Sequence, residues 1–370
     1  MMEDKVIFDK STVKSWGNAI RTKKGTTEEF PASQLEAEIL SIEASENLDA
    51  ERAEQDSIIA ELEVIINELP DLEGTPNLVY TLSSDGTYYI VGTGFTSIEA
   101  IETDIGGGTE KSGLDSTWQG GRVVIPATYN GKPVLAVAPR AFSAYYNITQ
   151  VYICDGITHL GHRCFNCPSS PWDTAMTSCR LPNTLVYVGG EDGRIFYGRQ
   201  GLTSMAIPMN VSDLTRAIFA YCNSLTAIYT SNVKKLVRSC FQDCSSLTKL
   251  NTDNIEVVGD VTFYNCSGLT ELNLPKVETI GNNVFYNTLN LTKVTIGPNC
   301  RSIDTSGLKC GSASNKCTFT FLGTTPPTIT ASTFTASNIN KIIVPKGCGE
   351  TYKTATNWTT LASLIEEAVE

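Results

Sequence analysis

Residues 258–274 read VGDVTFYNCSGLTELNL, and residues 280–296 read IGNNVFYNTLNLTKVTI. The two stretches align without a gap, and their phenylalanines, Phe263 and Phe285, stand 22 residues apart. Phe219 and Phe241 continue the same period toward the N-terminus. A fixed period of this length indicates a repeat protein, in which units stack because none can bury its apolar face alone.

The positions around each Phe define the repeat unit. A Leu-Thr pair begins six residues after the Phe, and the following residues alternate between apolar and polar, which predicts a strand with one buried face. The positions nine and eleven residues after the Phe are expected to point inward: Ile228, Leu250, Leu272, Leu274, Val294 and Ile296. The positions eight and ten residues after the Phe are expected to point outward as a ladder of candidate binding residues: Lys249, Asn251, Glu271, Asn273, Lys293 and Thr295, with Tyr152 and Tyr229 at the same phase.

This consensus resembles the BspA-type leucine-rich repeat, which is known from bacterial surface proteins, phage proteins and some protist surface proteins. Weaker copies extend the array to nine units between about residues 137 and 345. The resemblance implies a β-rich lead-in and cap segment over 73–136 and a solenoid over 137–348. It also implies a capping segment over 349–370, with its helix at about residues 359–368. For function it implies adhesion or recognition, without a shared ligand.

The N-terminal part of the sequence follows a different pattern. Residues 34–69 lack Gly and Pro and carry apolar residues at helical spacing, which predicts a coiled-coil stalk over 44–72. Its expected oligomerisation positions are Leu48, Ile58, Leu62, Ile65 and Leu69. We expect a homotrimer, although the short heptad pattern leaves a dimer open. The chain is therefore predicted to be an α+β protein, a helical coiled-coil stalk followed by a solenoid.

Residues 1–43 hold a second resemblance. The stretch AIRTKKGTTEEFPASQL at 19–35 is similar to a short module at the N-terminus of phage tail and virion structural proteins. In that module the pattern is A-I-R-x-K-T-G-x-x-E-x-I-P-x-S, and Lys24 replaces its Thr. The resemblance implies a virion attachment module over 1–43.

Charge and hydropathy exclude some functions. The formal net charge is −12, and residues 1–72 hold 17 acidic against 7 basic residues, so the remainder is nearly neutral. A nucleic-acid partner would require basic clusters and is not expected. With no apolar stretch at the N-terminus and no run of 18 apolar residues, we expect neither a signal peptide nor membrane insertion.

No residue pattern points to catalysis. The two histidines, His159 and His162, precede Cys164 and Cys167, a set of zinc-ligand types, but the repeat phase favours turn and core roles. The recurring cysteines Cys222, Cys244 and Cys266 are interpreted as small buried side chains, and GGGTEKS at 106–112 lacks the Gly-Lys-Ser of a phosphate loop. We therefore predict no enzyme, no metal and no cofactor, although a hydrolase site built from distant carboxylates stays open.

These observations together predict a phage virion protein of a tail fibre, baseplate or head fibre. It would be made in the bacterial cytoplasm, dock to other virion proteins through its N-terminus, and bind a host-surface glycan or protein through the repeats. The alternatives are a bacterial BspA-like surface adhesin and a purely structural virion protein that binds another virion component.

Overall fold

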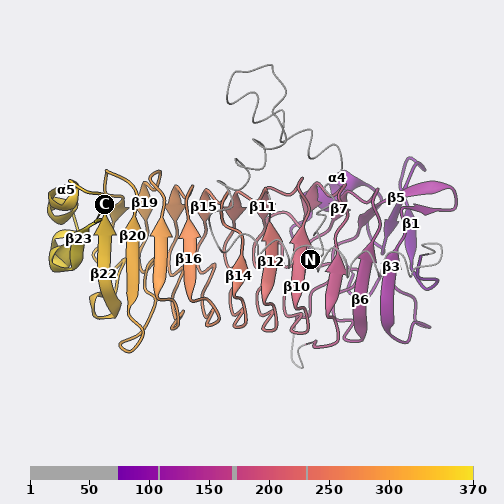
Figure 1. Ribbon diagram of the computed structural model, residues 1–370. Helices are drawn as coiled ribbons and strands as arrows, with labels where there is room; N and C mark the ends of the chain where they lie inside the picture. The colour runs from indigo at the N-terminus through magenta and orange to yellow at the C-terminus, as the bar shows by residue number, and fades with distance from the viewer. Residues whose placement is uncertain (1–73, 107–108, 169–172, 231, 370) are drawn as a thin grey trace, which may run out of the picture. The chain divides into compact units, whose positions relative to one another are not determined.

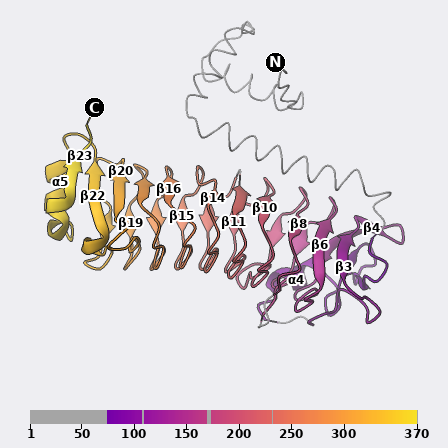
Figure 2. The ribbon, with the colours of Figure 1, turned by 60° about the horizontal axis from the view of Figure 1, so that its bottom comes forward.

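In the computed structural model, the described residues are 74–106, 109–168, 173–230 and 232–369. The predicted attachment module and the stalk, with its five apolar positions, lie outside these ranges. The described residues form a β-solenoid whose coils stack side by side (Figures 1 and 2). The helical part of the predicted α+β fold is the stalk and so lies outside these ranges; the described residues contain two α-helices, α4 (Ile98–Thr103) and α5 (Gly349–Thr354), of six residues each. No helix among them is long and apolar enough to cross a bilayer.

Each coil contributes a strand to a long-strand face made of parallel sheets. In β16 and β18 the paired residues are one repeat apart, as Glu271 and Lys293 show, so one repeat makes one coil. The strands of this face are β3 (Gly121–Ile125), β6 (Ile148–Ile153), β8 (Ser178–Arg180), β10 (Ser204–Ile207), β12 (Ala227–Thr230), β14 (Lys249–Leu250), β16 (Glu271–Leu274), β18 (Lys293–Ile296), β20 (Cys317–Phe321), β22 (Ile339–Val344) and β23 (Ile365–Glu367).

A second, short-strand face also runs along the solenoid. Its strands are parallel except for β1, which pairs antiparallel with β2, and for β4 (Thr128–Tyr129), which pairs antiparallel with β5. The strands are β1 (Tyr80–Leu82), β2 (Tyr89–Val91), β5 (Lys132–Val137), β7 (His159–Leu160), β9 (Tyr187–Val188), β11 (Asp213–Leu214), β13 (Lys235–Leu236), β15 (Val257–Val258), β17 (Thr279–Ile280), β19 (Ser302–Ile303) and β21 (Thr328–Ile329).

The repeated phenylalanines form one continuous column in the core. Neighbouring rings are stacked with centroids 5.0–5.8 Å apart, and every ring is fully buried. The column consists of Phe142, Phe165, Phe196, Phe219, Phe241, Phe263 and Phe285. Because stacked rings and parallel ladders hold each repeat position at a constant spacing, surface residues at one repeat position also line up in rows.

The array is longer than the nine predicted units. The long-strand sheets hold three, three and five strands, which makes eleven. The lead-in segment contributes a full coil, since β3 pairs in parallel with β6 and β2 with β5. The prediction fell short because these segments lack the Phe and Leu-Thr signature, whereas backbone pairing needs only an extended chain of suitable length.

The C-terminal cap also differs from the prediction. The expected helix at 359–368 is a 3-10 helix, η2 (Thr359–Leu364), followed by β23, which pairs with β22. A strand covers the open backbone groups of β22, which a helix leaves unpaired. The end of the core is closed by aromatic rings: Trp358 and Tyr352 are fully buried, and their polar atoms donate to the carbonyls of Pro327 and Gly323. A further short 3-10 helix, η1 (Ala336–Asn338), precedes β22.

Candidate functional site

The predicted outward ladder lies on the solvent side of the long-strand face. In β16 and β18 the buried and exposed side chains alternate as expected: Leu272, Leu274, Val294 and Ile296 are buried. The exposed positions of the ladder are Lys249, Asn251, Glu271, Asn273 and Lys293, while Thr295 and Tyr229 are half-buried. Lys293 Nζ lies 3.7 Å from Glu271 Oε2. Because both side chains are well exposed, this ion pair is weak. The ladder residues are thus accessible to a partner, and their role in binding stays a prediction.

Tyr152 differs from its neighbours in the ladder because it is buried. It belongs to a small apolar cluster on the outer side of the sheet, with Val124 and Cys154, which is separate from the main core. The guanidinium of Arg180, on the next coil, lies 5.0 Å from the Tyr152 ring centroid. The repeat phase of Tyr152 was predicted correctly, but the neighbouring coil covers the ring.

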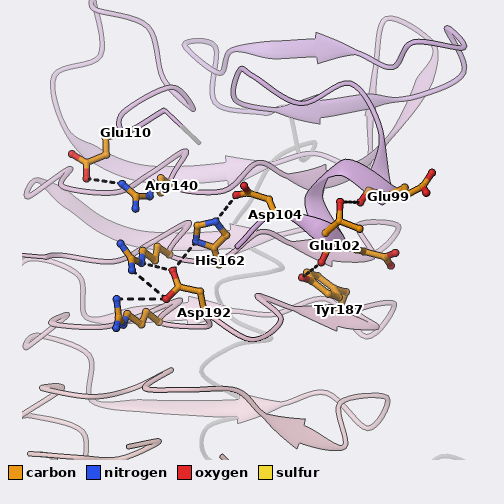
Figure 3. A network of polar contacts seen from close by, with 11 residues as sticks. Glu99, Glu102, Asp104, Glu110, Arg140, His162, Tyr187 and Asp192 are labelled. Carbon is orange, nitrogen blue, oxygen red and sulfur yellow. Dashed lines mark hydrogen bonds and ion pairs between the residues drawn. The ribbon is translucent and has the colours of Figure 1, made fainter. Parts of the chain in front are cut away.

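The histidines contact carboxylates near the N-terminal end of the solenoid. His162 Nε2 lies 2.6 Å from Asp104 Oδ2, and its Nδ1 lies 3.2 Å from Asp192 Oδ2. His159 Nε2 lies 2.9 Å from Glu102 Oε1. Figure 3 shows the contacts of His162 with Asp104 and Asp192. His162 is fully buried, so these contacts tie α4 and the loop after it to the coils. Within the described ranges, no cluster of three His, Cys, Asp or Glu side chains has the arrangement of a metal site.

The cysteine column is buried as expected. The thiols of Cys222, Cys244 and Cys266 each donate to the carbonyl of the core Phe one coil earlier, over 3.0–3.2 Å. Burial raises the pKa of the Cys222 thiol to about 12, and it raises the pKa values of Cys244 and Cys266 as well. The column therefore holds neutral thiols with a packing role rather than reactive thiolates.

The structure shows a cavity that the sequence analysis missed. A groove of about 400 Å³ lies over the segments that flank the core phenylalanines. We call it the arginine groove, and its lining residues are Arg163, Asn166, Pro168, Arg194, Tyr197, Arg216, Ala217, Ala220, Tyr221, Arg238, Ser239 and Gln242. The groove collects four arginines in a part of the chain whose charge is nearly balanced.

Backbone hydrogen bonds hold the arginines in adjacent coils. The amide of Arg194 donates to the carbonyl of Arg216 over 2.8 Å, and the amide of Ala217 donates to the carbonyl of Arg238 over 2.9 Å. Neighbouring strands of a sheet lie about 5 Å apart, so the arginine rows have that spacing. The signal was present in the sequence, because each arginine stands two or three residues before a core Phe.

The arginines differ in how their charges are compensated. Asp192 lies 2.7 Å from Arg163 Nε and 3.5 Å from the guanidinium of Arg194 (Figure 3). Arg216 and Arg238 are exposed, and neither forms an ion pair with a carboxylate of the described residues. Burial lowers the pKa of Arg194, with a further contribution from the nearby positive charges of Arg163 and Arg216. The groove therefore carries uncompensated positive charge at its Arg216–Arg238 end.

Comparison with known proteins points to one repeat family. A family model for the BspA type leucine rich repeat region matches residues 172–260 and 251–361, with six copies, and together the matches span slightly more than half of the chain. Among curated proteins there is no match.

Several solved structures are similar to the chain. A leucine-rich repeat protein of T. pallidum has 20% identity, covers 60% of this chain and 81% of its own, and gives a TM-score of 0.39. A leucine-rich cell surface protein of Faecalibacterium prausnitzii has 16% identity, with coverage of 82% and 96% and a TM-score of 0.35. The pneumococcal vaccine antigen PcpA has 13% identity, with coverage of 80% and 98% and a TM-score of 0.36.

Proposed function

The chain belongs to the BspA-type leucine-rich-repeat family, and on that premise we propose that it is a recognition protein whose solenoid binds a glycan or protein of a host surface. The observation that carries this proposal is the ladder on the long-strand face. There, β14, β16 and β18 carry rows of exposed side chains, and parallel pairing fixes the register of β14 with β12 and of β16 with β18. Because the paired backbone is already ordered, only the side chains of the row lose conformational entropy when they bind a partner at several points.

The ladder varies in chemistry from coil to coil, which favours specific recognition. Lys249 and Lys293 supply positive charge, Glu271 supplies negative charge, and Asn251 and Asn273 supply amides. A mixture of donors and acceptors suits a polar partner such as a glycan or a protein loop.

Binding to cells tests this proposal. Fluorescently labelled full-length chain is expected to bind a subset of a panel of Gram-positive and gut bacteria. Asn273→Ala with Lys293→Ala, on the ladder, is expected to weaken binding by roughly tenfold or more. Lys234→Ala is the matched control, because this exposed lysine stands beside β13 on the short-strand face. If no cell type binds the chain, or if the control variant loses as much binding as the ladder variant, the proposal fails.

We further propose that the chain is a virion component of a tail fibre, baseplate or head fibre, with residues 1–43 as the docking module and a trimeric stalk. The order of module, stalk and solenoid along the sequence supports this placement. Trimerisation would multiply weak single-site binding through avidity. Mass spectrometry of purified phage particles is expected to detect the chain. Detection in a bacterial cell-wall fraction instead would establish the second candidate, a BspA-like surface adhesin, which the family membership supports equally.

The proposed role is binding without catalysis. The lining of the arginine groove holds no carboxylate, histidine or thiol, so it offers no general acid, general base or nucleophile of these types. Incubation of the chain with the surface polymers of bound cells is expected to release no new reducing ends or free monomers. Release above a heat-inactivated control would contradict this proposal.

A further inference from the structure

We propose that the arginine groove is a binding site for an acidic oligosaccharide, with a sugar carboxylate held between Arg216 and Arg238. This inference rests on the proposed function, because it names a ligand class for that recognition and places its binding on a second side of the solenoid. Three features of the groove carry it: uncompensated charge, a buried acceptor without a donor, and paired aromatic rings.

The positive charge of the groove favours a ligand that carries a carboxylate. Arg163 and Arg194 share the single negative charge of Asp192, whereas Arg216 and Arg238 form no ion pair within the described part of the chain. Their guanidinium groups come from adjacent coils about 5 Å apart. A planar guanidinium donates two parallel hydrogen bonds to a carboxylate, so two adjacent arginines clamp one such group from both sides.

The buried acceptor in the groove favours a ligand that donates from a hydroxyl group. Asn166 lines the groove and is only 3% exposed, and its Oδ1 accepts no hydrogen bond from any described residue. A buried acceptor without a donor is costly, and most such groups in proteins are satisfied by a partner. Inorganic phosphate or a polyphosphate at neutral pH offers this oxygen few or no donors, whereas each sugar ring carries several hydroxyl donors.

The aromatic rings fit the apolar faces of sugar rings. Tyr197 and Tyr221 line the groove with their ring centroids 5.1 Å apart in an edge-to-face arrangement. Burial raises the pKa values of both phenols, so the rings are neutral at physiological pH and do not repel an anion. Aromatic faces of this kind stabilise ligands through contact with C–H groups.

The length of the groove indicates an oligosaccharide rather than a single sugar. Asn166 follows Phe165, and Arg238 precedes Phe241, so the lining spans four coils of the Phe column. Three spacings of about 5 Å give roughly 15 Å from one end to the other. A nucleic acid fits this groove poorly, because nucleic-acid binding depends on many phosphate contacts, whereas the groove offers four arginines in a part of the chain that is otherwise nearly neutral.

Calorimetric titration of the full-length chain tests the inference. The probes are hexasaccharides of galacturonate, of mannuronate and of hyaluronan, each compared with the same oligosaccharide after its carboxyl groups are reduced to alcohols. We expect at least one acidic probe to bind, and its reduced form to bind at least about tenfold more weakly. Raising the ionic strength is expected to weaken binding, because Arg216 and Arg238 are exposed.

Variants locate the binding. Arg216→Gln with Arg238→Gln is expected to lower the affinity by roughly a hundredfold, about tenfold for each charge-assisted contact. The matched control is Lys234→Gln with Lys276→Gln, which removes two exposed positive charges that lie outside both the groove and the ladder and is expected to leave affinity unchanged. Asn166→Leu removes the buried acceptor and is expected to weaken binding by several fold. Circular dichroism spectra of the variants verify that they are folded.

Three results would overturn the inference: no acidic probe binds, the lysine control loses as much affinity as the arginine variant, or a hexaglutamate peptide binds as tightly as the best glycan. The last result would assign the groove to acidic peptides. Cell binding separates this inference from the proposed function. If no acidic probe binds but the chain still binds cells, the groove inference fails while the proposed recognition role stands. If the chain binds an acidic probe but no cell, the recognition role fails while the groove inference stands.

Discussion

Replacing Asp173 by Asn is expected to open the coils around Phe165 and Phe196, because it leaves a buried positive charge without its partner. Arg199 stands three residues after Phe196, where the later coils carry the buried cysteine. Its side chain is fully buried and forms an ion pair with Asp173, which is also buried. Asn at 173 keeps the side-chain oxygen that accepts from the Ala175 amide, and its NH2 group replaces the oxygen that accepts from Arg199, so the substitution removes both the negative charge and this acceptor.

The magnitude follows from the contacts that remain. Arg199 keeps its hydrogen bonds to the carbonyls of Phe165 at 2.5 Å, Tyr145 at 2.7 Å and Phe142 at 3.1 Å. These carbonyls accept from three of the five N–H groups of the guanidinium but do not neutralise its charge. Removing one partner of a buried ion pair costs about 3–5 kcal/mol. Because 1.4 kcal/mol is a factor of about ten, amide exchange through local opening should accelerate by about two to four orders of magnitude.

Hydrogen exchange with mass spectrometry measures this effect coil by coil, which matters because a long repeat array does not unfold as one two-state unit. Peptides covering β8 to β12 are expected to exchange faster, and peptides covering β18 and β20 serve as the internal control. The double variant Asp173→Asn with Arg199→Met removes the charge as well and is expected to recover part of the loss. Acceleration of less than about tenfold in the single variant, or strictly additive effects in the double variant, would refute the reasoning.

Three further predictions follow from single contacts. Gly297→Ala is expected to destabilise the adjoining coils by about 1–3 kcal/mol, measured by hydrogen exchange of the peptides that cover β16 and β18, because its Cβ would lie 1.8 Å from the carbonyl oxygen of Pro275. Cys348 is expected to react with a disulfide reagent at about pH 8 before the other eleven thiols, which are buried and should react only on unfolding. The amides of Gly347, before α5, and of Gly349, its first residue, donate to Glu367 and lower the pKa of its carboxyl group, so this contact stabilises the cap above the usual Glu pKa and is lost as pH falls below it. Amide exchange of the cap between about pH 3 and pH 6, corrected for intrinsic rates, should show this loss, and Glu367→Gln should abolish it.

Each of these predictions has a control. Gly106→Ala adds a Cβ with no atom within 4 Å and should leave stability unchanged. Rapid labelling of several thiols in the folded chain would contradict the buried cysteine column. A cap that responds to pH equally in the parent and in Glu367→Gln would assign the pH response to another carboxyl group.

The repeat period allowed much of the fold to be predicted. The alternation after each Leu-Thr pair correctly placed Leu272 and Leu274 inside and Glu271 and Asn273 outside, because side-chain direction in a strand is a local property. The same reasoning placed Tyr152 on the outer side of the sheet but missed that Arg180 covers it. Burial of an outward side chain depends on the coil next to it, which the period does not describe. The coils at both ends were missed for a related reason, since β3 and β23 join the sheet through backbone hydrogen bonds that leave little sequence signature.

The sequence by itself determined the period, the side of each strand that faces the core, and the columns of Phe and Cys, because these follow from local geometry repeated every 22 residues. Only the tertiary structure decided which surface residues meet. Arg163 and Arg194 are 31 residues apart, while Arg194 and Arg216 are 22 apart, yet all three line one groove. The extra residues between the first two do not change the stacking of the coils. Backbone pairing then brings each arginine to within about one strand spacing of the next, so the tertiary structure created the charged site.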